Sequence, residues 1–173
     1  MRLGESRLTI QDVVSNEGFD ATTHMLLYHV NVGWPVVDDG AELLAPGPTE
    51  GYRTIHGPVA GYVEQVFEHD LHADADGRVP VAVVNRAAGL GAYQVYRRDQ
   101  LPFHYVWRML GEGTYVIGIE PSTNRPAGRL EARDRGELIE LGPGETRLYE
   151  LELGALDGEA QIERFASRVA ALV

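Results

Sequence analysis

The sequence predicts an all-β protein, an antiparallel β-sandwich with a short C-terminal helix. Three observations lead to this prediction. Turn-forming residues recur about every eight to twelve residues. The segments between them alternate apolar and polar side chains or are apolar throughout, and only the last part of the chain has helical spacing. We expect the 173 residues to form one domain, 1–173, because a chain of this length buries roughly 70% of its unfolded surface.

The predicted strands lie between these turn formers. Their bounds are 6–15, 24–32, 63–69, 79–84, 91–97, 103–109, 114–120, 137–141 and 146–154. Alternation is clearest in the last strand, where Tyr149, Leu151 and Leu153 share one face. The segment 114–120 is apolar on both faces, which predicts a central strand that is covered on both sides.

Two short turns and two long loops connect these strands. Residues 73–77 (Ala-Asp-Ala-Asp-Gly) predict a hairpin turn, because Asp-Gly readily adopts the positive φ angles that such turns need. Gly-Pro-Gly-Glu at 142–145 predicts a second one. The stretches 36–61 and 121–135 are long, and the first is rich in Pro, Gly and Asp, so they are candidate walls of a site.

The C-terminal segment predicts the one helix. Asp157 is the expected N-cap residue. The apolar residues that follow are spaced by three or four, as on one face of a helix: Ile162, Phe165, Val169 and Leu172.

Charge and composition limit the classes of partner. A formal net charge of −11 argues against nucleic acid and against an anionic membrane, since phosphates are repelled. With no cysteine, the chain has no disulfide, thiolate nucleophile or Cys-ligated zinc, and we expect a cytoplasmic location. No apolar run approaches eighteen residues, so no membrane-spanning helix is expected. No basic and apolar leader is visible at Met1, so no secretory signal is expected either.

The strongest candidates for chemistry are His29 and Glu120, each at or just beyond an apolar strand. A half-buried imidazole and carboxylate can together donate one proton and remove another, which ring opening of an aldose requires. Burial at a strand end should raise the pKa of Glu120 toward that of a general base. For Glu120, the structural alternative is an ion pair with an arginine such as Arg108 or Arg129. For His29, it is a histidine buried for structural reasons.

Other motifs point to no cofactor. His24 and His29 lie five apart and so face opposite sides of a strand, which excludes a metal pair. The acidic stretch 68–77 has calcium-like spacing without the downstream bidentate glutamate. The sequence holds no His-x-His of a cupin, no dinucleotide fingerprint and no nucleophile elbow. Neither a metal nor an organic cofactor is expected.

Several stretches resemble the galactose mutarotase (aldose 1-epimerase) superfamily, in an uncharacterised branch. They are Leu-Leu-Tyr-His-Val-Asn-Val-Gly-Trp-Pro at 26–35, Leu-Pro at 101–102 with the run from Trp107 to Asn124, and Leu-Gly-Pro-Gly-Glu at 141–145. The resemblance covers nearly the whole chain but only the second half of a typical member. It implies part of a large antiparallel supersandwich with the sugar in a groove across one sheet.

The resemblance also implies roles for individual residues. His29 would be the general acid for the ring oxygen, and Glu120 the base for the anomeric hydroxyl. Candidates for binding the sugar are Trp34, Asp70, Trp107, Arg108 and Asn124. The arginine and second histidine that members supply from their first half have no counterpart here.

We therefore expect an aldose mutarotase or related sugar epimerase that acts on a monosaccharide or a sugar derivative. The alternatives are a non-catalytic carbohydrate-binding module and a truncated relic of the family. A half-length sandwich exposes sheet edges, and such edges tend to pair, so a homodimer is also expected.

Overall fold

The fold was determined as a computed structural model that describes residues 4–49 and 51–173. Its strands and helices, in chain order, are β1 (Arg7–Ser15), β2 (Thr22–His24), β3 (Val30–Val32), β4 (Glu42–Leu44), β5 (Gln65–His69), β6 (Arg78–Asn85), β7 (Leu90–Arg97), β8 (Phe103–Gly111), β9 (Thr114–Ser122), α1 (Arg129–Asp134), β10 (Ile139–Leu141), β11 (Thr146–Asp157) and α2 (Glu159–Ala170). Every pairing between these strands is antiparallel, so the predicted all-β fold with a C-terminal helix is confirmed.

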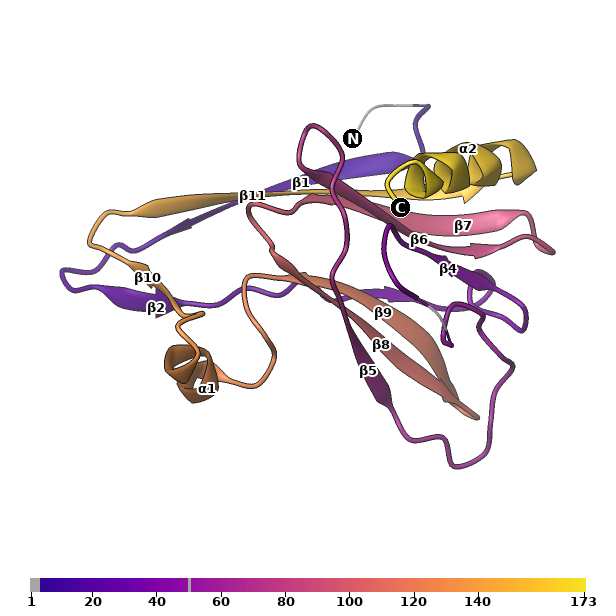
Figure 1. Ribbon diagram of the computed structural model, residues 1–173, viewed down its shortest axis with the longest axis horizontal. Coiled ribbons are helices and arrows are strands. Elements are labelled where there is room, and N and C mark those ends of the chain that lie inside the picture. The colour runs from indigo at the N-terminus through magenta and orange to yellow at the C-terminus, as the bar shows by residue number, and fades with distance from the viewer. Residues whose placement is uncertain (1–3, 50) are drawn as a thin grey trace.

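Two sheets face each other across the core (Figure 1). The first has the order β1-β11-β7-β6-β4, and the second has the order β3-β9-β8-β5. The small pair β10-β2 lies at one end, beside α1. Helix α2 covers the outer side of the five-stranded sheet, as Figure 1 shows. No described helix is long and apolar enough to cross a membrane.

Strand β6 shows why the sequence folds into these layers. It is apolar along most of its length, and its residues from Val79 to Asn85 are buried. Val79, Val81 and Val83 pack in the core between the sheets, whereas Ala82 and Val84 pack under α2. Since side chains alternate along a strand, a continuous apolar run is what a strand between two apolar layers needs.

The predicted strand 24–32 is divided in the structure. Its first part belongs to β2, where His24 pairs with Ile139 of β10. From Leu27 onward the chain pairs instead with β9, beginning with a bridge to Ser122 and continuing in β3. The chain changes partner within this segment, and local sequence pattern does not record which strand a residue will pair with.

Both predicted long loops contain short elements. The stretch 36–61 includes β4, which pairs with β6, and 121–135 includes α1. The turn at 73–77 forms, with the amide of Gly77 donating to Asp74 O. It is not a hairpin, however, because β5 and β6 belong to different sheets. The turn at 142–145 likewise leads from one sheet to another.

The prediction that Asp157 caps the helix was wrong. Asp157 ends β11, and Gly158 is the N-cap residue of α2, with φ of 81° and no side-chain cap. A positive φ suits glycine, which has no Cβ to clash with the backbone. The predicted apolar face is confirmed at Ile162, Phe165 and Val169, which are all buried.

Two histidines lie in the core between the sheets. His69 and His104 are 3% and 1% exposed, and their ring centroids are 5.6 Å apart. Burial lowers the pKa of His69 to about 4. Burial also lowers the pKa of His104 far below its ordinary value, and the charge of His69 adds to that effect. Both rings are therefore neutral in the folded protein at neutral pH.

This pair predicts acid sensitivity. A histidine whose pKa is lowered by folding binds its proton more readily when unfolded, so stability falls as the pH drops from about 6.5 toward 4. The shift of His69 alone corresponds to about 3 kcal/mol at most. Unfolding by denaturant at several pH values measures this slope.

The matched variants are His69→Phe and His56→Gln. His69→Phe keeps a flat ring in the core and should reduce the pH dependence between 6.5 and 4, leaving the part that comes from His104. His56 is exposed, so His56→Gln should keep the wild-type slope. An unchanged slope in His69→Phe would exclude His69 as the source.

Candidate functional site

The pairing of residues 27–32 with β9 brings the two main candidates together. Leu27 bridges Ser122, the amide of Tyr28 donates to Pro121 O at 3.0 Å, and Val30 pairs with Ile119. His29 is therefore directly opposite Glu120 on the neighbouring strand. Cross-strand partners have their Cβ atoms about 5 Å apart, so two segments about ninety residues apart in sequence present adjacent side chains.

The imidazole and the carboxylate are in contact. His29 Nε2 lies 2.9 Å from Glu120 Oε1, and the two side chains are 44% and 8% exposed, respectively. This is ion-pair distance, but Glu120 Oε1 has no well-aligned hydrogen bond. The structure therefore places His29 and Glu120 in contact, with the half-exposed histidine outside and the carboxylate buried behind it.

Burial changes the chemistry of the carboxyl group. It raises the pKa of Glu120 above its ordinary value, and the neighbouring His29 opposes this shift only in part. Desolvation disfavours the charged form, so this carboxyl group holds its proton more strongly than an exposed one. Beside it, the half-exposed ring of His29 is accessible to solvent.

An aromatic ring stands next to this pair on the same face of the sheet. Trp107 of β8 is opposite Gly118 of β9, and Tyr105 is opposite Glu120. The His29 and Trp107 rings meet edge to face, with centroids 5.5 Å apart and planes at 69°. The indole Nε1–H donates to Glu64 Oε2 at 2.8 Å, which fixes the orientation of the ring.

Gly118 provides the space in which the pair sits. A Cβ at this position would lie 2.5 Å from Glu120 Oε1 and 2.9 Å from His29 Cε1. Contacts that short force a neighbour to move. The glycine is therefore required for the close approach of the two groups over β9, and this requirement does not come from its backbone angles.

Arg108 lies on the other side of the sheet. Because it follows Trp107 directly, it points toward the core, where Nη1 and Nη2 donate to Tyr52 O and Thr54 O at 3.2 and 3.4 Å. It is 5% exposed, and burial lowers its pKa. The alternative in which Arg108 pairs with Glu120 is excluded by this geometry.

The remaining sequence candidates have partners of their own. Asp70 is exposed and pairs with Arg98 at 2.8 Å. Asn124 is 4% exposed, and its side-chain amide donates to Arg125 O at 2.8 Å, which holds it within its loop. Trp34 is 77% exposed just beyond β3. None of these residues contacts His29 or Glu120 through a hydrogen bond or ring contact in the described part of the chain.

Sequence reasoning missed Glu64, Tyr105 and the packing role of Gly118. Tyr105 is 2% exposed beside Glu120, and burial raises its pKa. A signal for it exists, because residues 105 and 107 share one face of a strand in period-two alternation. No such signal exists for Glu64, which lies outside any strand and reaches Trp107 only through the tertiary fold.

Nothing in the described residues gathers three or more histidine or acidic side chains as a metal ion would need. In the acidic stretch 68–77, Asp74 Oδ1 accepts hydrogen bonds from the amides of Asp76 and Arg78. These bonds explain the local spacing as a turn.

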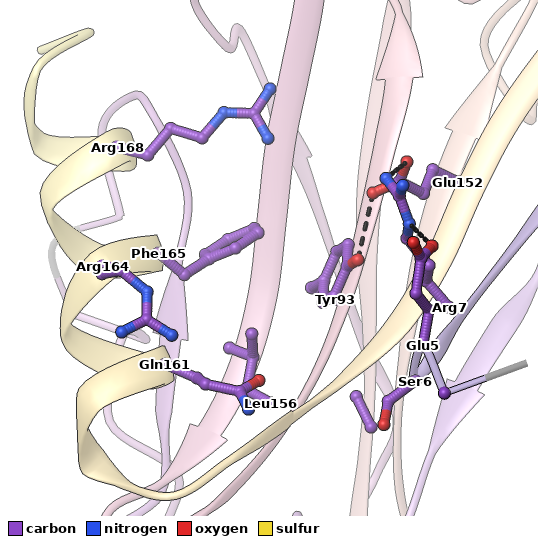
Figure 2. Close-up of a pocket in the computed structure, with 12 residues that line it drawn as sticks. Glu5, Ser6, Arg7, Tyr93, Glu152, Leu156, Gln161, Arg164, Phe165 and Arg168 are labelled. Carbon is purple, nitrogen blue, oxygen red and sulfur yellow. Dashed lines mark hydrogen bonds and ion pairs between the residues drawn. The ribbon is translucent and has the colours of Figure 1, made fainter. Parts of the chain in front are cut away.

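A separate cavity of about 520 Å³ lies between α2 and the five-stranded sheet (Figure 2). On its sheet side, Arg7 pairs with Glu5 and Glu152, and the hydroxyl of Tyr93 donates to Glu152 at 3.0 Å. Arg164 and Arg168 project from the helix side (Figure 2). This cavity contains none of the predicted site residues, and the charged groups on its sheet side already neutralise one another.

The crowding at Gly118 makes a first prediction for this site. Gly118→Ala should lower the free energy of unfolding by about 1–3 kcal/mol, because the methyl group displaces the carboxylate and the imidazole. The double variant Gly118→Ala/Glu120→Ala should lose less than the sum of the two single variants, since the carboxylate is the nearer obstacle. Gly33→Ala is the control, because its nearest neighbour is 3.9 Å away. Strict additivity in the double variant would contradict this account.

The raised pKa of Glu120 makes a second prediction. A carboxyl group whose pKa is raised by folding weakens the folded state at pH values above that pKa. Glu120→Gln should therefore increase the free energy of unfolding at pH 8, by about 1 kcal/mol. The gain should shrink as the pH falls toward 4.5, the ordinary value for glutamate. Glu140→Gln, at an exposed position, should change little; a loss of stability in Glu120→Gln would indicate a structural role for the carboxylate.

Solved structures share this fold. A crystal structure from Klebsiella pneumoniae, provisionally assigned as an aldose 1-epimerase, superposes with a TM-score of 0.93 at 27% identity, over 98% of this chain and 48% of that one. The galactose mutarotase related enzyme from Lactobacillus acidophilus gives 0.62 at 10% identity, over 88% of this chain and 58% of that one. A galactose mutarotase-like protein from Clostridium acetobutylicum gives 0.58 at 12% identity, over 86% and 52%.

These comparisons confirm the sequence resemblance and the mutarotase-like fold. The last two similarities concern the fold alone. The chain spans about half the length of the solved structures that it matches. A search of curated proteins finds no match. Residues 1–155 match the family model described as "Domain of unknown function (DUF4432)". The chain, whose sandwich carries the His29–Glu120 pair, therefore belongs to the DUF4432 family.

Proposed function

We propose that this protein acts on a sugar as an aldose 1-epimerase-like isomerase, with Glu120 as general base and His29 as general acid. The observation that carries the proposal is the contact of 2.9 Å between His29 Nε2 and Glu120 Oε1 on the solvent-open face of the four-stranded sheet. The likeness to the Klebsiella protein, at 27% identity over 98% of this chain, supports the same chemistry.

The reaction needs an acid and a base close together. In a cyclic aldose, the anomeric hydroxyl oxygen and the ring oxygen are both bonded to C1. One group must remove the hydroxyl proton while the other protonates the ring oxygen, and each must lie within about 3 Å of its oxygen. Two groups in mutual contact can separate slightly and receive these neighbouring oxygens between them.

Each residue then has a defined role. The Glu120 carboxylate takes the proton of the anomeric hydroxyl, and its raised pKa makes it a stronger base than an exposed glutamate. Protonated His29 donates to the ring oxygen as the C1–ring oxygen bond breaks and the aldehyde forms. After rotation about C1–C2, the same transfers in reverse close the ring as the other anomer, so no net proton is consumed.

Trp107 provides the wall beside the acid. Its indole is held by Glu64 and contacts the His29 ring. A large aromatic face of this kind also suits the C–H side of a sugar ring. Arg108, Asp70 and Asn124 are not assigned to sugar binding in this proposal. Each is held by other partners, away from the His29–Glu120 pair.

Exchange between anomers can be measured directly by NMR saturation transfer on a panel of aldoses, including sugars with acidic substituents. Wild-type chain should accelerate exchange, and Glu120→Gln should reduce the acceleration by about 100- to 10,000-fold, the range for loss of a general base. His29→Gln should have an effect of similar size. Glu140→Gln, an exposed carboxylate on β10, should retain wild-type exchange.

The outcomes separate the two functions under consideration. Saturable sugar binding with no acceleration of exchange would overturn the isomerase proposal in favour of a carbohydrate-binding module. Acceleration that survives in Glu120→Gln would remove this carboxylate as the base. Absence of both binding and exchange across the panel would exclude a sugar-directed function for the isolated chain.

A further inference from the structure

Glu64 and Trp107 form a second pair of side chains on the outer face of the four-stranded sheet. Glu64 directly precedes β5, and Trp107 lies on β8, the neighbouring strand. The indole Nε1–H donates to Glu64 Oε2 at 2.8 Å. Since β9, β8 and β5 lie in this order across the sheet (Figure 1), Trp107 stands between Glu64 on one side and the His29–Glu120 pair on the other.

The carboxylate of Glu64 has room for further hydrogen bonds. A carboxylate accepts about four hydrogen bonds, and the indole occupies one of these positions. Glu64 is exposed, and in the part of the chain that the structure describes no arginine pairs with it. Glu68 on β5 differs, because Arg125 holds it at 2.9 Å. Glu64 is therefore oriented by one hydrogen bond and open to hydroxyl donors at its other positions.

An apolar strip separates the carboxylates of Glu64 and Glu120. Val66 of β5 is opposite Trp107 in the register, so the two side chains share the outer face. Val66 is 54% exposed although it is apolar. The C–H groups on one side of a sugar ring suit such a surface, and the hydroxyls at the edge of the ring then need polar partners. A strip with a carboxylate at each end supplies both kinds of contact.

The separation of the two carboxylates fits one sugar ring. Glu120 is on β9, and Glu64 directly precedes β5, with β8 between them. Neighbouring strands lie about 4.8 Å apart, so the span is about 10 Å. A hydrogen bond of about 2.8 Å at each end leaves room for one pyranose ring. When the anomeric hydroxyl lies at Glu120, the hydroxyl on C4 points toward Glu64, because C4 is opposite C1 in the ring.

We propose that Glu64 is a specificity-determining residue of this site, and that it selects free monosaccharides in the pyranose form with an unsubstituted C4 hydroxyl. The carboxylate accepts the hydrogen bond of that hydroxyl, and the neighbouring C3 hydroxyl is a second donor. Its bond to the indole keeps the apolar strip and the acceptor in one fixed arrangement. The inference rests on the proposed function, since it requires a sugar beside His29 and Glu120, and it adds the substrate class.

Deletion of single hydroxyls from the sugar tests the contact. The probes are D-glucose and D-galactose with their 2-deoxy and 4-deoxy analogues, and their binding is measured by NMR titration, which does not depend on turnover. Glu64→Gln should bind the parent sugars about 10-fold more weakly, because a neutral acceptor replaces a charged one. The 4-deoxy analogues should bind equally to wild type and to Glu64→Gln. The 2-deoxy analogues, altered next to C1, should lose as much as the parent sugars.

Two further variants separate a direct contact from an effect through Trp107. The amide oxygen of Glu64→Gln can still accept from the indole, so a purely structural role of Glu64 predicts wild-type binding. In a Trp107→Phe background there is no indole N–H to hold, and Glu64→Gln should still weaken binding of the parent sugars. Glu112→Gln is the matched control, at an exposed position in the turn between β8 and β9, and should bind like wild type.

The outcomes distinguish this inference from the proposed function. Wild-type binding by Glu64→Gln, or equal binding of the parent and 4-deoxy sugars by the wild-type chain, would overturn the role of Glu64 even if anomer exchange is accelerated. Binding that depends on Glu64 and on the C4 hydroxyl, without accelerated exchange, would support Glu64 and overturn the isomerase. Absence of binding for all of these sugars would overturn both.

Discussion

The pairing of the segment after Leu27 with β9 is the constraint on which the candidate site depends. It fixes His29 opposite Glu120, and the contact between the two follows from the register. A slip by one residue would turn one of the two side chains into the core, because strand side chains alternate between faces. The neighbouring core residues resist such a slip, since Val32, Ile117 and Ile119 are buried on the opposite face.

Alternation along β8 and β9 divides the polar residues into two groups with different chemistry. Toward the core lie His104 and Arg108, whose pKa values are lowered by burial. Toward the outside lie Trp107 and Glu120, with His29 beside them. Residues that are adjacent in sequence, such as Trp107 and Arg108, therefore belong to different environments. On the inner side, the buried His104 makes the fold sensitive to acid, and the outer group contains the two residues of the proposed site.

The carboxylate of Glu120 is kept in a position that stability alone would not favour. It is 8% exposed by side chain, its Oε1 lacks an aligned hydrogen bond, and the space around it exists only because residue 118 is glycine. Buried polar groups are usually fully hydrogen-bonded. Perturbed, incompletely satisfied acids next to a partner that can carry charge are typical of functional sites. For this reason the His29–Glu120 pair, and not the cavity beside α2, is our candidate.

The sequence alone determined the β-sandwich, the approximate bounds of most strands, the C-terminal helix and the two residues of the pair, because alternation, turn residues and strand-end polar groups are local properties. Tertiary structure decided the rest. It divided the segment 24–32 between two partners, turned Arg108 inward, brought Glu64 to Trp107 and gave Gly118 its packing role. These features depend on which strands are neighbours and in which register, and strand pairing joins residues far apart in the chain that no local pattern relates.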